Sequence, residues 1–356
     1  MIDQSIESQG NKGCSKHRIV YLDFLRLISA FFVIVNHTNS RVFLNSELSL
    51  TWYASIAYFF ASKIAVPVFL MITGAVSMNR EPTWNGYRRR VWRAVVVLIA
   101  ANVFYYLYSV WRTPNASIEA DKLVEAIFQS GARPLWYLHV YVICTLFMPF
   151  FQKFASVLTQ REERLFLLLS VGLNGVLGML PLLYPSAKVH SMFTAATVNS
   201  YIGFLFAGHY IEKYVKVRGH TALLALITWA GVLVLEVWLT GQYYQNSPNN
   251  FLKLDERTYL TIVVQAWCTF FVAKYLFRNL DNNTKLARVI CFLGKQTFGV
   301  YLLGELGISY LFFVYSTLAL DIPRMFAMVI YELAIFAACL LVTIVLRCIP
   351  IVRKYI

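Results

Sequence analysis

Three ionisable residues in one apolar segment have the types and the spacing to act together. Asp23 and Arg26 lie three residues apart, so on a helix they are surface neighbours. Arg26 and His37 are separated by about three helical turns, or roughly 16 Å along the axis. All three side chains can therefore face one interior, where Arg26 would meet an anion entering from one side of a membrane and His37 would lie toward the other side. The alternative is that Asp23 and Arg26 form a structural ion pair and that His37 caps the helix at the water interface.

The composition indicates that lipid surrounds this apolar segment. Hydrophobic residues make up 58% of the 356 residues, charged residues make up 14%, and the mean hydropathy is +0.58. A soluble globule of this length could not bury so much apolar surface, so lipid must surround it. Apolar runs of about 20 residues, each able to span a bilayer, predict an all-α, polytopic membrane protein with about ten transmembrane helices. They lie near residues 19–39, 55–78, 91–111, 135–152, 165–184, 198–211, 221–240, 259–277, 289–315 and 325–346.

The distribution of basic residues predicts the orientation of the chain. An even number of spans returns the chain to its starting side, and most Lys and Arg residues then fall on that side, which is typical of the cytoplasm. Both the N- and C-termini are therefore predicted to be cytoplasmic. Residues 1–18 would form a tail, 19–346 a single membrane domain and 347–356 a second short tail. The net charge of +14 indicates orientation and contact with anionic lipids, and we expect no nucleic acid as a partner.

Short motifs occur along the chain in an order and spacing that resemble one family. Leu22, Asp23 and Leu25 accompany the Arg26 and His37 pair in the first predicted helix. The later motifs are, in chain order, Lys63, Ala65, Val66, Pro67 and Phe69 with Thr73 and Gly74; Arg90 with Arg93; Leu135–Leu138; Tyr201–Phe204 with Gly208; and Leu293–Leu302. Together, over residues 18–346, they resemble the acyltransferase family 3 integral membrane proteins, which transfer acyl groups from acyl-CoA to extracytoplasmic sugars.

The resemblance implies a membrane O-acyltransferase, and most simply an O-acetyltransferase that uses acetyl-CoA. His37 would be the general base for a sugar hydroxyl, because its pKa lies near neutrality, or a transient acyl carrier. Asp23 would orient Arg26, which would grip the pantetheine end of CoA or polarise the thioester. Arg90 and Arg93, one helical turn apart, would bind the phosphates, although a basic run beside a helix end also follows from membrane orientation. No metal is expected.

Four further side chains are candidates for cofactor or substrate binding. Lys63 would contribute to the CoA site, or it would form a structural pair with Glu305 inside the membrane. Trp136, Tyr137 and Glu305 would contact the sugar acceptor, while other aromatic residues such as Trp52 and Tyr53 suit a belt at the membrane surface. This chain departs from the family pattern at Gly304, where many members of the family carry His. The role of that His is either absent here or taken over by Glu305.

The resemblance also sets the expected partners and location. These are acyl-CoA, a polysaccharide or lipid-linked sugar as acceptor, and membrane lipids, in the plasma membrane of a bacterium. A polar neighbour such as Asn36 would fix the tautomer of His37. A secondary transporter or flippase for an anionic or sugar-linked substrate remains the alternative, although the related halves that transporters often have are not evident in this sequence. An inactive relative that scaffolds polysaccharide assembly is a third possibility.

Overall fold

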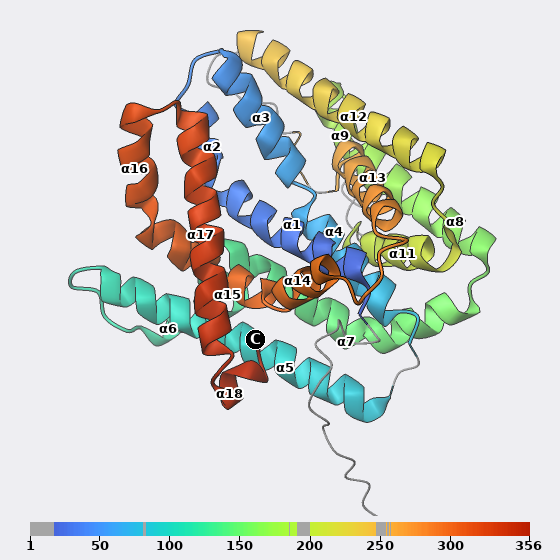
Figure 1. Cartoon of the computed structure of the whole chain (residues 1–356), viewed down its shortest axis with the longest axis horizontal. Coiled ribbons are helices and arrows are strands. Elements are labelled where there is room, and N and C mark those ends of the chain that lie inside the picture. Colours follow the sequence, from blue (N-terminus) through green and yellow to red (C-terminus); the bar gives the residue numbers. More distant parts are fainter. Residues whose placement is uncertain are drawn as a thin grey trace, which may run out of the picture.

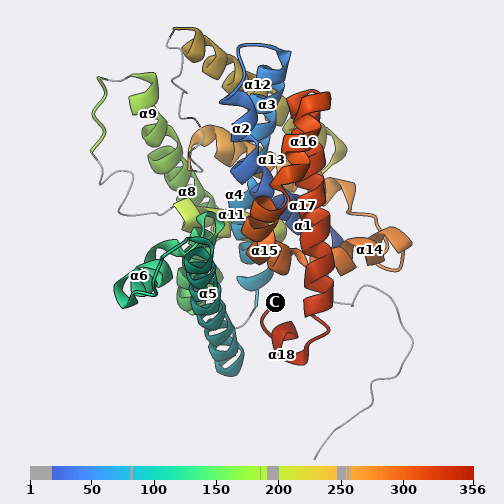
Figure 2. The same ribbon diagram turned by 90° about the vertical axis from the view of Figure 1, so that its left-hand side faces the viewer.

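The computed structural model describes residues 18–80, 83–184, 186–190, 200–246, 254, 256 and 258–356. Within these residues every regular element is a helix and no strand occurs, as Figures 1 and 2 show from two directions. The predicted all-α fold class is therefore confirmed.

The described helices follow one another along the chain in this order. The N-terminal half contains α1 (Val20–Thr38), α2 (Ser40–Phe43), α3 (Leu50–Ser62), α4 (Ala65–Ser77), α5 (Trp84–Arg112), α6 (Ala120–Glu125), η1 (Ala126–Ser130), η2 (Arg133–Leu135), α7 (Trp136–Val157), α8 (Gln160–Ser170), η3 (Val171–Val176) and α9 (Leu177–Leu183). The C-terminal half contains α11 (Ser200–Tyr214), α12 (Gly219–Asn246), α13 (Leu260–Leu276), α14 (Lys285–Gly294), α15 (Thr297–Tyr310), α16 (Phe312–Asp321), α17 (Arg324–Leu346) and α18 (Pro350–Arg353).

Seven of the described helical stretches are long and apolar enough to cross a membrane. They are Val20–Phe43, Leu50–Ser77, Trp84–Arg112, Arg133–Val157, Gln160–Leu182, Gly219–Asn246 and Arg324–Leu346. The pair α14 and α15 makes an eighth if a bend of 58° is counted as one span, while α11 and α13 are shorter. Each predicted apolar segment thus lies on a helix, and the chain is a multi-pass membrane protein. Its orientation stays a prediction.

Short polar residues begin several of these helices. Ser49 accepts a hydrogen bond from the amide of Trp52 at 3.3 Å and so starts α3. Thr159 and Glu162 form a reciprocal capping box at the start of α8, in which the Glu162 carboxylate accepts from the Thr159 amide at 2.7 Å. Such caps satisfy amide groups that the first helical turn leaves unpaired. They explain why α8 begins before the apolar run that predicted it.

Two glycines allow α4 and α11 to cross at very close range. A Cβ atom at Gly74 would collide with the backbone of Leu205, and a Cβ atom at Gly208 would collide with the backbone of Met71. Between helices in lipid, packing and hydrogen bonds drive association, and small residues allow the backbones to approach. The structure thus gives a packing reason for two glycines of the sequence motifs.

The helix α1 lies near the centre of the bundle (Figure 1), where it packs against α3, α4, α13, α14, α15 and α17. The segment predicted as one span over 289–315 is divided, because Lys295 and Gln296 break it between α14 and α15 and Leu311 separates α15 from α16. At the first break, a Cβ atom at Gly294 would lie 2.7 Å from the Cβ of Asp23. The glycine therefore lets the broken span pack directly on the buried carboxylate of α1.

Candidate active site

Near the N-terminal end of α1, the Asp23 carboxylate binds the side chains of two arginines. Its carboxylate is fully buried and accepts from Arg18 Nε at 2.6 Å through Oδ2, while the second nitrogen of Arg18 and Nη1 of Arg26 both donate to Oδ1. The expected contact between Asp23 and Arg26 is present. Arg18, five residues before Asp23 and outside the helix, was not anticipated because no helical spacing pointed to it.

The two guanidinium groups remain about a quarter exposed, at 25% for Arg18 and 27% for Arg26. Both line a cleft with a volume of about 400 Å³ at the start of α1, together with Arg80 of the α4–α5 connection. The one acidic residue in its wall, Glu212, accepts hydrogen bonds from Tyr21 and from Lys274 at 3.0 Å. The cleft therefore presents cations to a negatively charged ligand.

The predicted pair Arg90 and Arg93 divides between two places. Arg90 lines a small polar pocket between α4, α5 and α7, whose other residues are Thr73, Ser77, Tyr87, Tyr141, Thr145, Met148 and Gln152. Tyr141 of this pocket acts electrostatically on Arg26, so the pocket lies toward the Arg26 end of α1. Arg93 instead donates through Nε to the Tyr355 carbonyl at 3.1 Å and lies 5.9 Å from the Phe298 ring. Arg90 and Arg93, which the sequence paired, therefore have different neighbours.

At the other end of α1, the residues on both sides of His37 are tied to neighbouring helices. His37 is half-buried in the last turn. Asn36 donates to the Ser62 carbonyl of α3 at 2.8 Å, and Asn39 donates to the Ser55 carbonyl at 2.7 Å. Among the described residues Asn36 Oδ1 has no hydrogen-bond partner, and the group that fixes the tautomer of His37 stays a prediction.

A buried glutamate completes this end of the site and was missed from sequence. Glu332 of α17 is fully buried and accepts from the Thr38 hydroxyl at 2.6 Å and from the Tyr58 hydroxyl at 2.8 Å. It joins α1, α3 and α17 at the residue that follows His37. The signal available in the sequence was an acidic residue within an apolar span, which usually marks a site or a buried pair.

Glu305 and Lys63 lie in different surroundings. Glu305 of α15 is half-buried and is acted on by the charges of Arg133 and Arg41. Arg41, one helical turn beyond His37, stacks over the Phe312 ring at 4.6 Å. The ammonium group of Lys63 lies over the Phe59 ring at 3.9 Å. The structure thus places Glu305 beside arginines at the His37 end of α1.

Position 304 faces α1. The nearest atom to a Cβ added at Gly304 would be in the side chain of Ile34, at 4.0 Å, which is an ordinary contact distance. Ile34 lies one turn before Thr38 on α1 and packs in the same cluster as Tyr331 of α17. A side chain at this position would therefore point toward the His37 end of α1, where Thr38 and Glu332 already form a hydrogen bond.

The aromatic pair that opens α7 packs inside the protein. Tyr137 lies edge-on to Tyr301 of α15 with ring centres 6.0 Å apart, and Trp136 lies 6.3 Å from Tyr201 of α11. The Tyr301 hydroxyl donates to the Pro134 carbonyl at 2.6 Å, which fixes α15 to the start of α7. The two residues predicted for acceptor binding thus line the interior between α7, α11 and α15.

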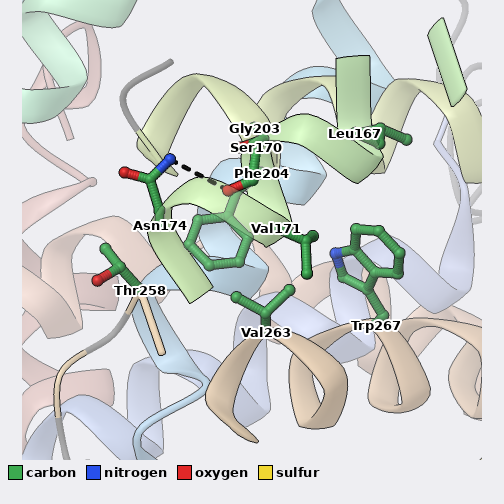
Figure 3. A pocket seen from close by; sticks show the side chains of 9 residues that line it. All are labelled: Leu167, Ser170, Val171, Asn174, Gly203, Phe204, Thr258, Val263 and Trp267. Atoms are coloured by element: carbon green, nitrogen blue, oxygen red, sulfur yellow. Dashed lines mark hydrogen bonds between the residues drawn. The ribbon is translucent and has the colours of Figure 1, made fainter. Parts of the chain in front are cut away.

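Other buried polar groups lie away from α1. Glu163 of α8 and His209 of α11 form a buried contact of 2.6 Å, and Gln265 of α13 donates to Glu236 of α12 at 2.7 Å. Figure 3 shows a further cavity beside α8, where Asn174 donates to the Ser170 carbonyl at 3.1 Å. Its volume of about 10 Å³ holds about one water molecule, too little for a sugar or a thioester. Within the described ranges, no three His, Cys, Asp or Glu side chains gather as a metal-binding group.

A bundle of membrane-spanning helices around α1, with cations near one end and His37 near the other, defines a multi-pass membrane protein with an intramembrane polar site. Residues 19–348 match a family model described as an acyltransferase domain, and this match covers nearly the whole chain. The chain belongs to the acyltransferase 3 family. No curated protein matches the chain, and no solved structure matches it.

Proposed function

We propose that this membrane acyltransferase moves an acetyl group from cytosolic acetyl-CoA to a hydroxyl of an extracytoplasmic or lipid-linked carbohydrate, in the plasma membrane of a bacterium. The observation that carries the proposal is the arrangement on α1, where Arg26 faces a cationic cleft at one end and His37 lies beside a buried hydrogen-bond network at the other. Membership of the acyltransferase 3 family supports the reaction class.

The donor would bind on the Arg26 side. Arg26 lies roughly 16 Å from His37 along α1, so its guanidinium group would grip the pantetheine arm through charged hydrogen bonds while the thioester reaches toward His37. Asp23 supports this role because it fixes Arg26 by a charged hydrogen bond and receives Arg18 as well. Arg90, whose pocket is next to Tyr141, would hold the donor deeper between α4 and α7. Lys63 also stays a proposed donor contact, and it lies nearer the His37 end of α1, because its neighbour Ser62 accepts a hydrogen bond from Asn36.

The acceptor would be activated by His37. In the direct reaction, His37 takes the proton of the sugar hydroxyl while that oxygen attacks the thioester carbonyl carbon. The C–S bond then breaks, an ester forms, and the CoA thiolate leaves and receives a proton. In the two-step alternative, an imidazole nitrogen of His37 attacks the thioester, the C–S bond breaks and CoA leaves as the thiol; the sugar hydroxyl then attacks the acyl-imidazole, the N–C bond breaks and free His37 is restored. Trp136, Tyr137 and Glu305 are proposed to contact the sugar.

The test follows CoA release by purified protein in nanodiscs supplied with acetyl-CoA, with and without carbohydrate acceptors. His37→Ala is expected to lower the rate at least about a hundredfold, in line with loss of a general base, and Arg26→Ala to lower it about tenfold or more through loss of a charged hydrogen bond to the donor. Lys122→Ala is the matched control, because Lys122 pairs with Glu119 on an exposed connecting segment away from α1.

The outcomes separate the function classes. Acceptor-dependent release that is lost in both variants supports acyl transfer. Binding of a sugar or anion without CoA release by any acyl donor would favour a transporter or flippase. Equal release by the wild type and His37→Ala would remove His37 from the reaction.

A further inference from the structure

Three polar side chains are buried between α12 and α13, away from the proposed active site. The two helices lie side by side (Figure 1) and pack against each other. Glu236 of α12 and Gln265 of α13 are fully buried, and Thr261 is buried one turn before Gln265 on the same face of α13. We call Glu236, Thr261 and Gln265 the seam cluster. An acidic residue inside an apolar span usually marks a site or a buried pair, and the proposed reaction uses none of these residues.

The oxygen atoms of the seam cluster are only partly satisfied. Gln265 Nε2 donates to Glu236 Oε2 at 2.7 Å. Among the described residues, Glu236 Oε1, Gln265 Oε1 and Thr261 Oγ1 are buried and have no hydrogen-bond partner. The Thr261 hydroxyl lies beside the Glu236 carboxylate but completes no hydrogen bond with it. Each of these oxygens costs free energy in a buried place unless a ligand satisfies it.

The Glu236 carboxylate also lacks a countercharge. None of the ion pairs formed by the described residues includes Glu236, and the side chains that act on it, Thr261 and Gln265, are neutral. A buried carboxylate needs either a proton or a positive partner. A proton on Oε1 needs a single acceptor and would leave the Gln265 carbonyl oxygen unpaired. A cation contacts several oxygens at once, so three unpaired oxygens favour the cation.

We propose that the seam cluster binds a monovalent alkali cation such as Na⁺, with Glu236 Oε1, Gln265 Oε1 and Thr261 Oγ1 as its ligands. Hard cations prefer carboxylate, carbonyl and hydroxyl oxygens. One carboxylate balances one positive charge, whereas Ca²⁺ or Mg²⁺ would leave a net charge buried in the membrane. The ion is structural, takes no part in acyl transfer and stands independently of the proposed function.

The position of the seam cluster indicates what the ion stabilises. Close to Glu236 along α12, a Cβ atom at Gly241 would lie 2.9 Å from the Tyr53 ring of α3, so α12 and α3 pack tightly there. The helix α3 also carries Tyr58, which donates to Glu332 beside His37. A cation between α12 and α13 would therefore stabilise the helix pair against which α3 packs. Because the unfolded chain does not assemble this site, binding should raise the Tm.

The experiment uses the purified full chain in detergent. Binding of radiolabelled Na⁺ is measured in choline chloride at constant ionic strength, and the Tm is compared in NaCl and choline chloride. The wild type is expected to show a single saturable site and a higher Tm in NaCl. Glu236→Gln keeps the shape and removes the charge, so it should lose both the saturable binding and the difference in Tm. Thr261→Val removes one ligand and should raise the Kd for Na⁺ about tenfold.

Two matched controls make the same chemical changes elsewhere. Glu47→Gln changes an exposed glutamate between α2 and α3, and Thr343→Val changes a buried threonine of α17 whose hydroxyl donates to the Cys339 carbonyl at 2.7 Å. Both controls should bind Na⁺ as the wild type does.

Several results would overturn the inference. A wild type without saturable Na⁺ binding and with the same Tm in both salts would mean that Glu236 holds a proton instead. Saturable binding that persists in Glu236→Gln would place the ion elsewhere. If Glu236→Gln does not fold, Thr261→Val decides, and an unchanged Kd for Na⁺ in that variant would exclude the seam cluster. Displacement of Na⁺ by micromolar Ca²⁺ would contradict a monovalent site.

Discussion

At the scale of single residues, the environment of His37 is fixed by groups that do not themselves react. Thr38 and Tyr58 share the carboxylate of Glu332, and this contact joins three helices beside the proposed base. A buried acceptor with two donors is costly to disturb, because its removal leaves both hydroxyls without their partner. We therefore expect Glu332 to act as a positioning residue for His37 in the proposed reaction.

Glu332→Gln is predicted to lower kcat about tenfold or more and to leave the KM for acetyl-CoA unchanged. Gln keeps the shape and one acceptor oxygen, but its amide nitrogen cannot accept the second hydroxyl. Thr38→Val removes the same contact from the other side, so the double variant should be no slower than the slower single variant. Steady-state kinetics of all three variants check this. Additive losses, or a KM that rises with them, would contradict a shared positioning role.

Asp23, Arg26 and His37 could be chosen from sequence because their helical spacing placed them on one interior face. Glu332 and Arg18 could not be chosen in the same way. The hydrogen bonds of Glu332 join residues 38, 58 and 332, which no local spacing relates, and Arg18 reaches Asp23 from outside the helix. The division of Arg90 and Arg93 also depends on which helices surround α5, information that a basic run does not carry.

At the scale of elements, the crossing of α4 and α11 depends on the two glycines. Gly208→Ala is predicted to lower the Tm by several degrees, because the new methyl group meets the rigid backbone of Met71 and overpacking typically costs about 1–3 kcal/mol. Thermal unfolding of the purified protein in detergent measures this change.

Gly231→Ala on α12 is the matched control, since no atom lies within 4 Å of the added Cβ. Its Tm should stay the same or rise slightly, because Ala favours a helix over Gly. Equal stability of Gly208→Ala and the wild type would mean that the two helices do not cross as closely as described.

The apolar segments were predictable as helices because length and hydropathy alone determine a membrane span. The break in the predicted span over residues 289–315 could not be predicted from length and hydropathy. Lys295 and Gln296 are compatible with a helix, and at the bend of 58° Gly294 packs on Asp23, which lies far away in sequence. The separate helix α16 could not be predicted either, because the chain changes direction at Leu311 and hydropathy does not record such a change.

At the scale of the whole molecule, the predicted orientation can be tested with a native residue. Cys348 is a free, exposed cysteine directly after α17. If the C-terminus is cytoplasmic, a membrane-impermeant maleimide should label Cys348 in inside-out vesicles and not in intact cells. Cys348→Ala identifies the label that belongs to this residue. Labelling of Cys348 from outside intact cells would reverse the orientation, and the cleft at Arg26 would then face away from the cytosolic donor.

Because α1 is uninterrupted, it fixes the distance between the two ends of the proposed site. Val20–Thr38 form one continuous helix, so the distance of roughly 16 Å between Arg26 and His37 is set by helical rise and does not depend on a hinge. In the proposed reaction, the thioester arm must cover that distance. A donor held at its phosphates would deliver its acyl group only if its arm has the right length, so the protein would select donors by reach as well as by charge.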